Sequence, residues 1–271
     1  MLTTKHRLER LRLNAMLKKI ILISQYHEPA NDDVHVQEIL DCLTENLLSP
    51  LVRKVFLLQE NDSYNEKLLG LANSHKLVIV LTHKRLTVGA AFDFANSNVV
   101  EAEMAKVGGR LVTAIINNDN YVDNSAFHLD TLFNPLPVTN TIMFVSRTQT
   151  AVANPKVANS DNNVNQCKNF GGSADMWAFV PPFNYRQTSA SFDFYLGTYM
   201  LEELIAAEIS KYMPAWKMAN PCNHVILHHC HAYRKEAESR SDEFYSRMSI
   251  YSHRYATHSC IVFNLLVQII T

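Results

Sequence analysis

The chain has 271 residues, of which 47% are hydrophobic and 19% are charged, and its formal net charge is −1. This composition excludes an intrinsically disordered chain, which would have few apolar residues and a high net charge. Only 7 glycines and 9 prolines exclude a collagen-like or linker architecture. A near-neutral chain also excludes a nucleic-acid binder that depends on a large overall positive charge, so no nucleic-acid partner is expected.

Cysteine usage and the apolar runs indicate the compartment. The chain has five cysteines, an odd number without a CxxC pair, which favours free thiols in a reducing compartment over a disulfide framework. The apolar run at 20–23 is too short for a signal-peptide core. The apolar residues 260–270 fall short of the roughly 20 residues needed to cross a bilayer. We therefore expect a cytoplasmic protein without a membrane-spanning segment.

The first part of the chain alternates between aliphatic runs and amphipathic segments. Residues 20–23 are typical of a buried parallel strand. Residues 34–48 carry apolar side chains three and four positions apart, which predicts a helix. A strand over 52–58, a short helix over 65–74 and a strand over 76–81 are predicted next. This alternation predicts an α/β fold with a parallel sheet and helices on its faces.

The rest of the chain continues in the same way. The further elements are predicted as a helix over 88–107, strands over 110–116 and 140–146, a loop over 148–170, a strand over 176–180, a helix over 196–213 and a strand near 225–227. No internal repeat and no linker divides the sequence. A single domain over residues 1–271 is therefore predicted.

Polar residues follow several predicted strands, where ligands bind in parallel sheets. Three such segments lie at 24–27, 60–62 and 83–85. The strand over 110–116 ends in the most polar segment of the chain, which contains Asp119 and Asp123. Carboxylates at a strand end can hold a divalent cation. Asp and Asn are also common in plain turns and helix caps, so both interpretations stay open here.

A run of histidines near the end of the predicted fold is a second candidate for metal binding. In an extended segment His229 and His231 point to one side, and His228 and Cys230 point to the other. Imidazole is the commonest metal-ligating side chain. A surface histidine cluster without metal is the alternative.

Further candidates are single acidic, aromatic and basic residues. Asp175 and Trp177 could bind a sugar through its hydroxyls and its apolar face, or Trp177 could be a core anchor. Glu202 on a predicted helix is either a general base or part of a solvated face. Arg85 and Arg147 each follow a strand, where a guanidinium can bind a phosphate group, or each is an ordinary surface residue.

Several nucleotide and hydrolase motifs are absent from the sequence. It contains no GxxxxGK[ST] phosphate loop, no GxGxxG after the first predicted strand, and neither GxSxG nor HExxH. A P-loop nucleoside triphosphatase, a dinucleotide oxidoreductase and an α/β-hydrolase are therefore not expected.

The order of short motifs over about residues 18–240 resembles a family of small GT-A-like glycosyltransferases of bacteria and large algal viruses. The motifs are Gln25-Tyr26-His27, Leu58-Gln59-Glu60, Arg85-Leu86-Thr87, residues 117–123, Val145-Ser146-Arg147, residues 172–179, residues 193–197 and His229-Cys230-His231. The resemblance implies a GT-A-like (Rossmann-like) fold with a mostly parallel central sheet and helices on both faces. It implies a nucleotide-sugar-binding half over 18–147, an acceptor-binding half over 148–240 and an unassigned extension over 241–271.

The activity implied by the resemblance is transfer of a sugar from a nucleotide-diphosphate-sugar donor to a hydroxyl of a glycan or glycoconjugate. A divalent cation, Mn²⁺ or Mg²⁺, would assist it. Implied metal ligands are Asp119, Asp123, His229 and His231. The implied catalytic residues are Glu202, as the first choice for the base, and Asp175. Implied contacts to the nucleotide-sugar are Gln25, Tyr26, Glu60, Arg85, Asn118, Asp119, Arg147 and Trp177.

The chain departs from the family pattern at three places. Met200-Leu201-Glu202-Glu203 stands where the family has Gly-Cys-Asp-Asn, Ala174 stands where Gln is usual, and no second Asp lies two residues after Asp119. These departures leave open a catalytically silent nucleotide- or carbohydrate-binding protein on the same fold. The acidic residues and histidines also leave open a metal-dependent hydrolase.

Overall fold

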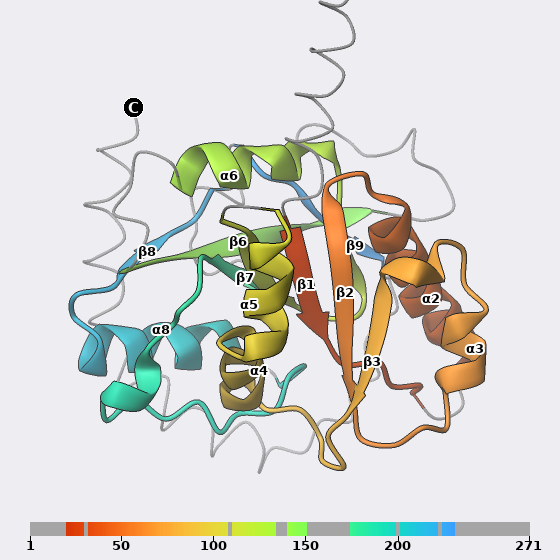
Figure 1. The fold of residues 1–271 in the computed structure, drawn as a ribbon, viewed down its shortest axis with the longest axis horizontal. Coiled ribbons are helices and arrows are strands. Elements are labelled where there is room, and N and C mark those ends of the chain that lie inside the picture. Colours follow the sequence, from red (N-terminus) through yellow and green to blue (C-terminus); the bar gives the residue numbers. More distant parts are fainter. Residues whose placement is uncertain are drawn as a thin grey trace, which may run out of the picture.

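The computed structural model describes residues 20–29, 32–107, 110–133, 140–150, 174–198, 201–221 and 224–230. Figure 1 shows how their helices and strands are arranged. The elements are β1 (Ile20–Ser24), α2 (Asp33–Leu48), β2 (Val52–Gln59), α3 (Asn65–Leu69), β3 (Leu77–Leu81), α4 (Val88–Ala95), α5 (Asn98–Ala105), β4 (Val112–Ile116), β5 (Asn120–Val122), α6 (Phe127–Phe133), β6 (Thr141–Thr150), β7 (Ala174–Phe179), α8 (Leu201–Tyr212), β8 (Lys217–Ala219) and β9 (Leu227–Cys230).

The described strands join in one mixed sheet in which most pairs are parallel. Its order is β3-β2-β1-β4-β7-β6-β9-β5, with β8 paired to β6. The neighbours from β3 to β4 are all parallel, as predicted from the alternating sequence. Strand β7 runs antiparallel to both β4 and β6. The long strand β6 pairs with β7 and β8 through its first half and with β9 through its second half, so it connects the two ends of the sheet.

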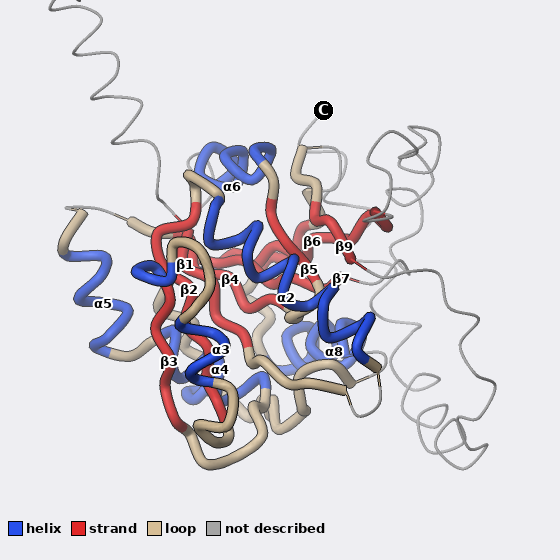
Figure 2. The backbone as a smooth tube through the Cα atoms, turned by 90° about the vertical axis from the view of Figure 1, so that its right-hand side faces the viewer, coloured by secondary structure: helices blue, strands red, loops and turns tan. Residues whose placement is uncertain are grey.

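Helices cover both faces of the sheet (Figures 1 and 2). Strand β1 is fully buried because its alternate side chains enter different cores. Ile20 and Leu22 pack in the core that contains residues of α2, α3 and α6. Ile21 and Ile23 pack in the core that contains residues of α4, α5 and α8. The result is the α/β fold predicted from the sequence, with a mostly parallel central sheet between two helical layers.

Helix α2 is fixed to the far edge of the sheet by a buried amide. Asn46, which is 4% exposed, donates from Nδ2 to the backbone oxygen of Asn120 at 2.9 Å. Its Oδ1 accepts from the backbone N–H of Val122 at 3.1 Å. Asp32 caps the other end of the helix by accepting from the N–H of His35. The Asn46 bonds thus fix the last turn of α2 to β5.

The helix predicted over 88–107 is two helices, because tertiary contacts interrupt it at Asn96. Asn96 accepts from the backbone N–H of Phe183 at 2.8 Å and donates to the backbone oxygen of Phe183 at 2.9 Å. Ser97 is extended (φ −78°, ψ 159°) and begins α5. Asn and Ser compete with the helical backbone for hydrogen bonds, and here the contact with Phe183 prevails.

Other boundaries also differ from those predicted. Strands β5 and β8 were not predicted, and β9 lies later than the predicted strand near 225–227. Helix α8 begins at Leu201, and residues 196–198 form a turn instead. Strand β6 extends into the predicted loop over 148–170, and the rest of that loop lies outside the described residues. Among the described helices, none has both the length and the apolar character to cross a membrane.

The two hydrogen bonds of the Asn46 side chain to β5, hereafter the clamp on α2, predict a large loss of stability for Asn46→Ala. The substitution leaves a buried carbonyl and a buried N–H of β5 without their partner, and each such group costs roughly 1–3 kcal/mol. We expect the free energy of unfolding, measured in urea, to fall by about 2–3 kcal/mol. Gln37→Ala, on the exposed side of the same helix, is the control and should change it by less than about 0.5 kcal/mol. Equal effects of the two substitutions would contradict the clamp.

Candidate functional site

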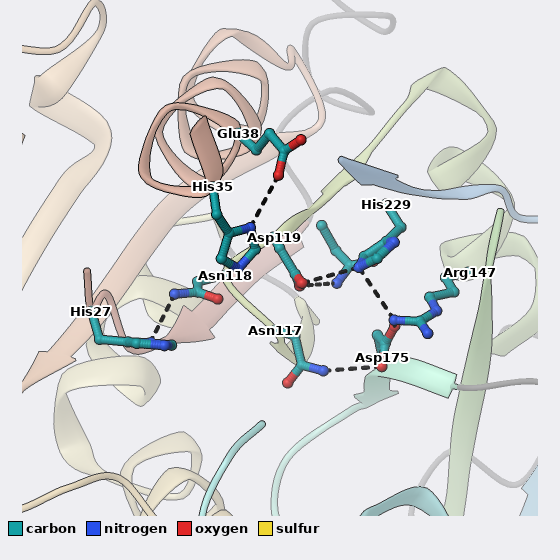
Figure 3. Close-up of polar contacts among 10 residues, drawn as sticks. His27, His35, Glu38, Asn117, Asn118, Asp119, Arg147, Asp175 and His229 are labelled. Carbon is teal, nitrogen blue, oxygen red and sulfur yellow. Dashed lines mark hydrogen bonds and ion pairs between the residues drawn. The ribbon is translucent and has the colours of Figure 1, made fainter. Parts of the chain in front are cut away.

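The candidate site lies where β4 ends, at the edge of the sheet that β4, β7, β6 and β9 share. The chain leaves β4 through Asn117, Asn118 and Asp119 and then enters the short strand β5. Asn117 is fixed to β7 because its N–H donates to the backbone oxygen of Asp175 at 3.0 Å. Its side-chain amide also donates to Asp175 Oδ1 at 3.0 Å. In Figure 3 the Asn117 side chain points toward Asp175 and that of Asp119 toward His229, whereas Asn118 points toward His27.

Asp119 and His229 form the centre of the site. His229 Nε2 lies 3.0 Å from Asp119 Oδ2, although 110 positions separate the two residues in the sequence. The antiparallel pairing of β5 with β9 sets Asn120 opposite His229, and the N–H of Cys230 donates to the backbone oxygen of Asp119 at 2.9 Å. The His229 side chain is 5% exposed and that of Asp119 is 20% exposed.

The pKa of Asp119 is lowered by the positively charged and hydrogen-bonding groups around it. Burial acts to raise it, but the hydrogen bond and charge of His229, together with the charges of Arg147 and His35, hold the pKa below its ordinary value. Asp119 is therefore a carboxylate at neutral pH. A buried, ionised oxygen at the end of a strand is suited to accept from a donor or to bind a cation.

Arg147 and Asp175 form a second charged pair beside the first. Arg147 NH1 lies 3.0 Å from Asp175 Oδ2 and 3.2 Å from His229 Nε2. The pairing of β6 with β7 brings Arg147 and Asp175 together. Burial raises the pKa of the Asp175 carboxyl, and the charge of Arg147 opposes that shift. The two pairs thus form one cluster, hereafter the central cluster, of Asp119, Asp175, Arg147 and His229.

One ring nitrogen in the central cluster contacts two groups with opposite requirements. The Asp119 carboxylate can only accept a hydrogen bond, so it requires a proton on His229 Nε2. The Arg147 guanidinium can only donate, so it requires a lone pair on the same nitrogen. One neutral imidazole cannot satisfy both with Nε2. Only one of the two contacts can therefore be a hydrogen bond in a given tautomer of His229.

Asp123 does not join the central cluster. His228 Nε2 lies 3.0 Å from Asp123 Oδ2, and the His228 ring stacks on Tyr121 with a centroid separation of 4.7 Å. Asp123 also accepts from the N–H of Ser125 and caps the short turn that follows β5. Neighbouring residues of a strand point to opposite sides, so His228 and His229 serve different carboxylates.

This arrangement corrects the predicted set of four metal ligands. Within the described residues, no three His, Cys, Asp or Glu side chains gather closely enough to hold a metal ion. Asp119 and His229 are together, Asp123 is with His228, and His231 lies outside the described residues. What remains of the prediction is a pair of ligands, Asp119 and His229.

Two histidines lie on the other side of Asp119: His27, which was predicted only as part of the segment 24–27, and His35, which was not predicted. Asn118 Nδ2 lies 3.1 Å from His27 Nδ1, and His35 Nδ1 lies 3.0 Å from Glu38 Oε2 (Figure 3). Burial, and then the charges of Arg85 and His35, lower the pKa of His27. His27 belongs to the polar segment after β1, which marks it in the sequence. Nothing in the sequence marks His35, because its place depends on how α2 crosses the sheet.

Other predicted contact residues have structural roles or lie at the rim. Gln25 accepts from the N–H of Leu86 at 3.1 Å and so fixes the loop after β3. Tyr26 is 3% exposed and donates to Glu28, and Trp177 is 0% exposed within the core. Their burial leaves no ring surface for a ligand, so we exclude Tyr26 and Trp177 from the site. Glu60 is exposed at the end of β2.

Glu202 lies in the first turn of α8 and is half-buried. Burial, joined by the charges of Asp175 and Glu203, raises its pKa to about 7, while its own backbone hydrogen bond and the charge of Arg147 oppose the shift. A carboxyl group with a pKa near the working pH is the type that general base catalysis requires. Two members of the central cluster, Asp175 and Arg147, are therefore among the charges that act on Glu202.

The ion pair in the central cluster predicts non-additive effects on stability. Arg147→Met leaves a buried carboxylate uncompensated, and we expect the free energy of unfolding to fall by about 2 kcal/mol. Asp175→Asn in the Arg147→Met background should recover at least about 1 kcal/mol, as a double-mutant cycle in urea would measure. Arg186→Met is the control, because its partner Asp93 is exposed, and it should cost less than about 1 kcal/mol. Purely additive effects of Arg147→Met and Asp175→Asn would contradict the pairing.

Comparisons with known proteins find solved structures of similar fold but assign the chain to no family. No protein-family model matches the chain, and no curated protein matches it. Among solved structures, a mannosyltransferase from Pyrobaculum calidifontis, in complex with GDP-mannose and Mn²⁺, is 13% identical with a TM-score of 0.49, and the match covers 89% of this chain and 62% of that one. The inositol-1-phosphate CTP transferase from T. maritima is 11% identical with a TM-score of 0.43, over 87% of this chain and 96% of that one. The chain thus spans about three fifths of the mannosyltransferase.

Both TM-scores are below 0.5, so the function is argued from the side chains of the site.

Proposed function

We propose that the protein is a glycosyltransferase that moves a sugar from a nucleotide-diphosphate-sugar donor to a hydroxyl group, with a glycan or glycoconjugate as the acceptor. The observation that carries the proposal is the central cluster. It gathers two carboxylates, a guanidinium and an imidazole at the sheet edge where α/β proteins bind ligands. The resemblance of the sequence motifs to GT-A-like glycosyltransferases supports the same reaction.

Departure of a nucleoside diphosphate is the electrostatic problem that such a site must solve. Negative charge develops on the leaving phosphate, and a fixed positive group beside it stabilises the transition state. Arg147 presents that charge from the middle of β6, where the strand backbone and Asp175 hold it in place. A guanidinium binds phosphate oxygens in a bidentate manner, which also orients the donor.

A divalent cation would take Asp119 and His229 as two of its ligands by replacing the hydrogen bond that joins them here. Two adjacent ligands of an octahedral ion, each about 2.1 Å from it, lie about 3.0 Å apart. Asp119 Oδ2 and His229 Nε2 have this separation. Mg²⁺ and similar ions need only one or two protein ligands when substrate phosphates supply others. When bound, a Mn²⁺ or Mg²⁺ ion would supply positive charge for the diphosphate.

The acceptor hydroxyl must lose a proton as it attacks the sugar, and Glu202 is the group best suited to take it. Its pKa of about 7 leaves it largely ionised above neutral pH while keeping it basic enough to accept the proton. Asp175 is a weaker choice, since it is engaged with Arg147 and Asn117. In the proposed reaction Asp175 holds Arg147 and positions it for the donor.

Donor binding should raise thermal stability. A ligand at a hundredfold excess over its Kd stabilises the folded state by roughly 2.7 kcal/mol. We expect at least one of the UDP-, GDP- or dTDP-sugars to raise the melting temperature when Mn²⁺ is present, and EDTA to reduce the shift. Asp119→Asn should remove the Mn²⁺-dependent part. Asp123→Asn is the matched control and should keep it, because Asp123 pairs with His228. If no nucleotide changes the melting temperature, the proposal fails.

Glu202 should control how the reaction depends on pH. We expect kcat/KM for donor turnover to rise with pH through an apparent pKa near 7, and Glu202→Gln to lower it by about a hundredfold or more. Glu203→Gln, one residue away on the exposed side, removes a charge that raises the Glu202 pKa, so it should lower the apparent pKa and leave the high-pH plateau of kcat/KM nearly unchanged. A pH profile that is the same with and without Glu202 would exclude it as the base.

The same group makes a separate prediction for stability. Because the folded-state pKa of Glu202 is raised, its contribution is fully present below the ordinary value of 4.5 and is lost as the pH rises through about 7. The free energy of unfolding of the wild type, measured in urea at a series of pH values, should therefore decline between pH 5 and pH 8 relative to that of Glu202→Gln. Parallel curves would show that the carboxyl is not perturbed.

The same assays distinguish the two alternatives left open by the sequence. A transferase slowly hydrolyses its nucleotide-sugar when no acceptor is present. A catalytically silent binding protein would show the thermal shift without hydrolysis. A metal-dependent hydrolase would also cleave phosphoesters that lack a sugar.

A further inference from the structure

Tyr195 has an exposed aromatic ring near the carboxyl edge of the sheet. Its side chain is 48% exposed, and among the described residues the other large exposed aromatic is Phe127, at 51%. Phe127 begins α6, which covers a different part of the molecule (Figure 1). Aromatic rings carry the largest burial energies at binding surfaces, so an exposed ring near a proposed active site requires an explanation.

The backbone around Tyr195 is held firmly, although the ring is exposed. Residue 195 pairs with Thr87 in an antiparallel bridge, and the N–H of Leu196 donates to the backbone oxygen of Leu86 at 3.1 Å. Thr198 closes the following turn by donating from its hydroxyl to the backbone oxygen of Tyr195 at 2.7 Å. Gly197 allows this turn, since its φ of +75° disfavours a side chain. A ring on such a support is pre-organised for binding.

Arg85 lies over one side of the ring. Its guanidinium carbon is 4.9 Å from the centre of the Tyr195 ring, and NH2 is 3.5 Å from the backbone oxygen of Leu196. A cation over the face of an aromatic ring attracts it and so fixes the orientation of both. Arg85 thus occupies one face of a ring that is still 48% exposed.

The ring is connected to the central cluster through a short series of contacts. Gln25 at the end of β1 holds the loop that carries Arg85 by accepting from Leu86. The charge of Arg85 acts on His27, and His27 lies 3.1 Å from Asn118, the neighbour of Asp119. Tyr195 and Arg85 therefore belong to the same rim as the proposed donor site.

We propose that Tyr195, supported by Arg85, is a stacking platform for a pyranose ring of the acceptor, an inference that rests on the proposed glycosyl transfer. A sugar acceptor carries no charge, so it gains little from the central cluster and needs an apolar contact. One face of a pyranose is apolar, and its hydroxyls can stay in water when it lies on an open ring. A nucleobase also stacks on aromatic rings, and the thermal shifts by nucleotide-sugars described below distinguish the two occupants.

Saturation-transfer NMR with the full chain tests the platform directly. The probes are methyl pyranosides of glucose, galactose, mannose and N-acetylglucosamine. We expect at least one of them to receive saturation from the wild type, and Tyr195→Leu, which removes the ring but keeps an apolar side chain, to weaken binding by about tenfold. Tyr195→Phe should bind as the wild type does, and Phe127→Leu is the control for a general loss of exposed aromatic surface.

Thermal shifts by nucleotide-sugars separate failure of the platform from failure of the proposed function. If donors shift the wild type and the Tyr195→Leu variant equally while only the pyranoside signal is lost, both proposals stand. If Tyr195→Leu weakens the donor shift instead, the ring belongs to a nucleobase site and the platform is wrong. If no pyranoside binds the wild type, or Tyr195→Leu binds as well as Tyr195→Phe, the platform is also wrong. If no donor shifts the wild type, the proposed transferase fails, whatever the pyranosides do.

Discussion

The pairing of β5 with β9 is the constraint on which the site depends. Strand β9 comprises Leu227–Cys230 and lies between β6 and β5. This position alone brings His229 to Asp119 from a distant part of the sequence. The register also decides which histidine is used, because a shift of one residue would turn His228 toward Asp119 and His229 away. Asn46 secures the arrangement from the other side by binding both ends of β5.

The carboxyl groups of Asp119, Asp175 and Glu202 have pKa values shifted in different directions, because their partners differ. Burial acts to raise the pKa of each one. In Asp119 the imidazole of His229, together with the charges of Arg147 and His35, outweighs burial, and the group stays ionised. In Asp175 and Glu202 burial outweighs the charge of Arg147. Carboxyl groups with separated pKa values can serve different roles, one as a permanent anion and another as a proton acceptor.

The sequence predicts well what depends on local patterns and poorly what depends on distant contacts. The strands of the parallel part of the sheet follow from continuous aliphatic runs, and α2 follows from its apolar periodicity. The break at Asn96 could not be predicted, since it depends on Phe183. Asp119 and Arg147 were identified as candidates because they follow predicted strands, His229 because of the run of histidines, and Asp175 because Trp177 lies beside it. The contact partner of each one was not predicted. Asp123 was therefore grouped with Asp119 and His229, whereas it pairs with His228.

The replacement of Asp by Glu at position 202, relative to the family pattern, is consistent with an active site. The first turn of a helix normally stabilises a carboxylate, by about 0.3–1 kcal/mol, and so lowers its pKa. In Glu202 burial and the neighbouring acidic groups outweigh this effect. Leu201 and Ile205 are 2% and 0% exposed and anchor α8 in the core, so the helix itself fixes where the Glu202 side chain begins. The longer side chain extends from that anchor by one methylene more than Asp would. The exposed neighbour Glu203 also has a raised pKa, through burial alone, so what distinguishes Glu202 is the added charge of Asp175.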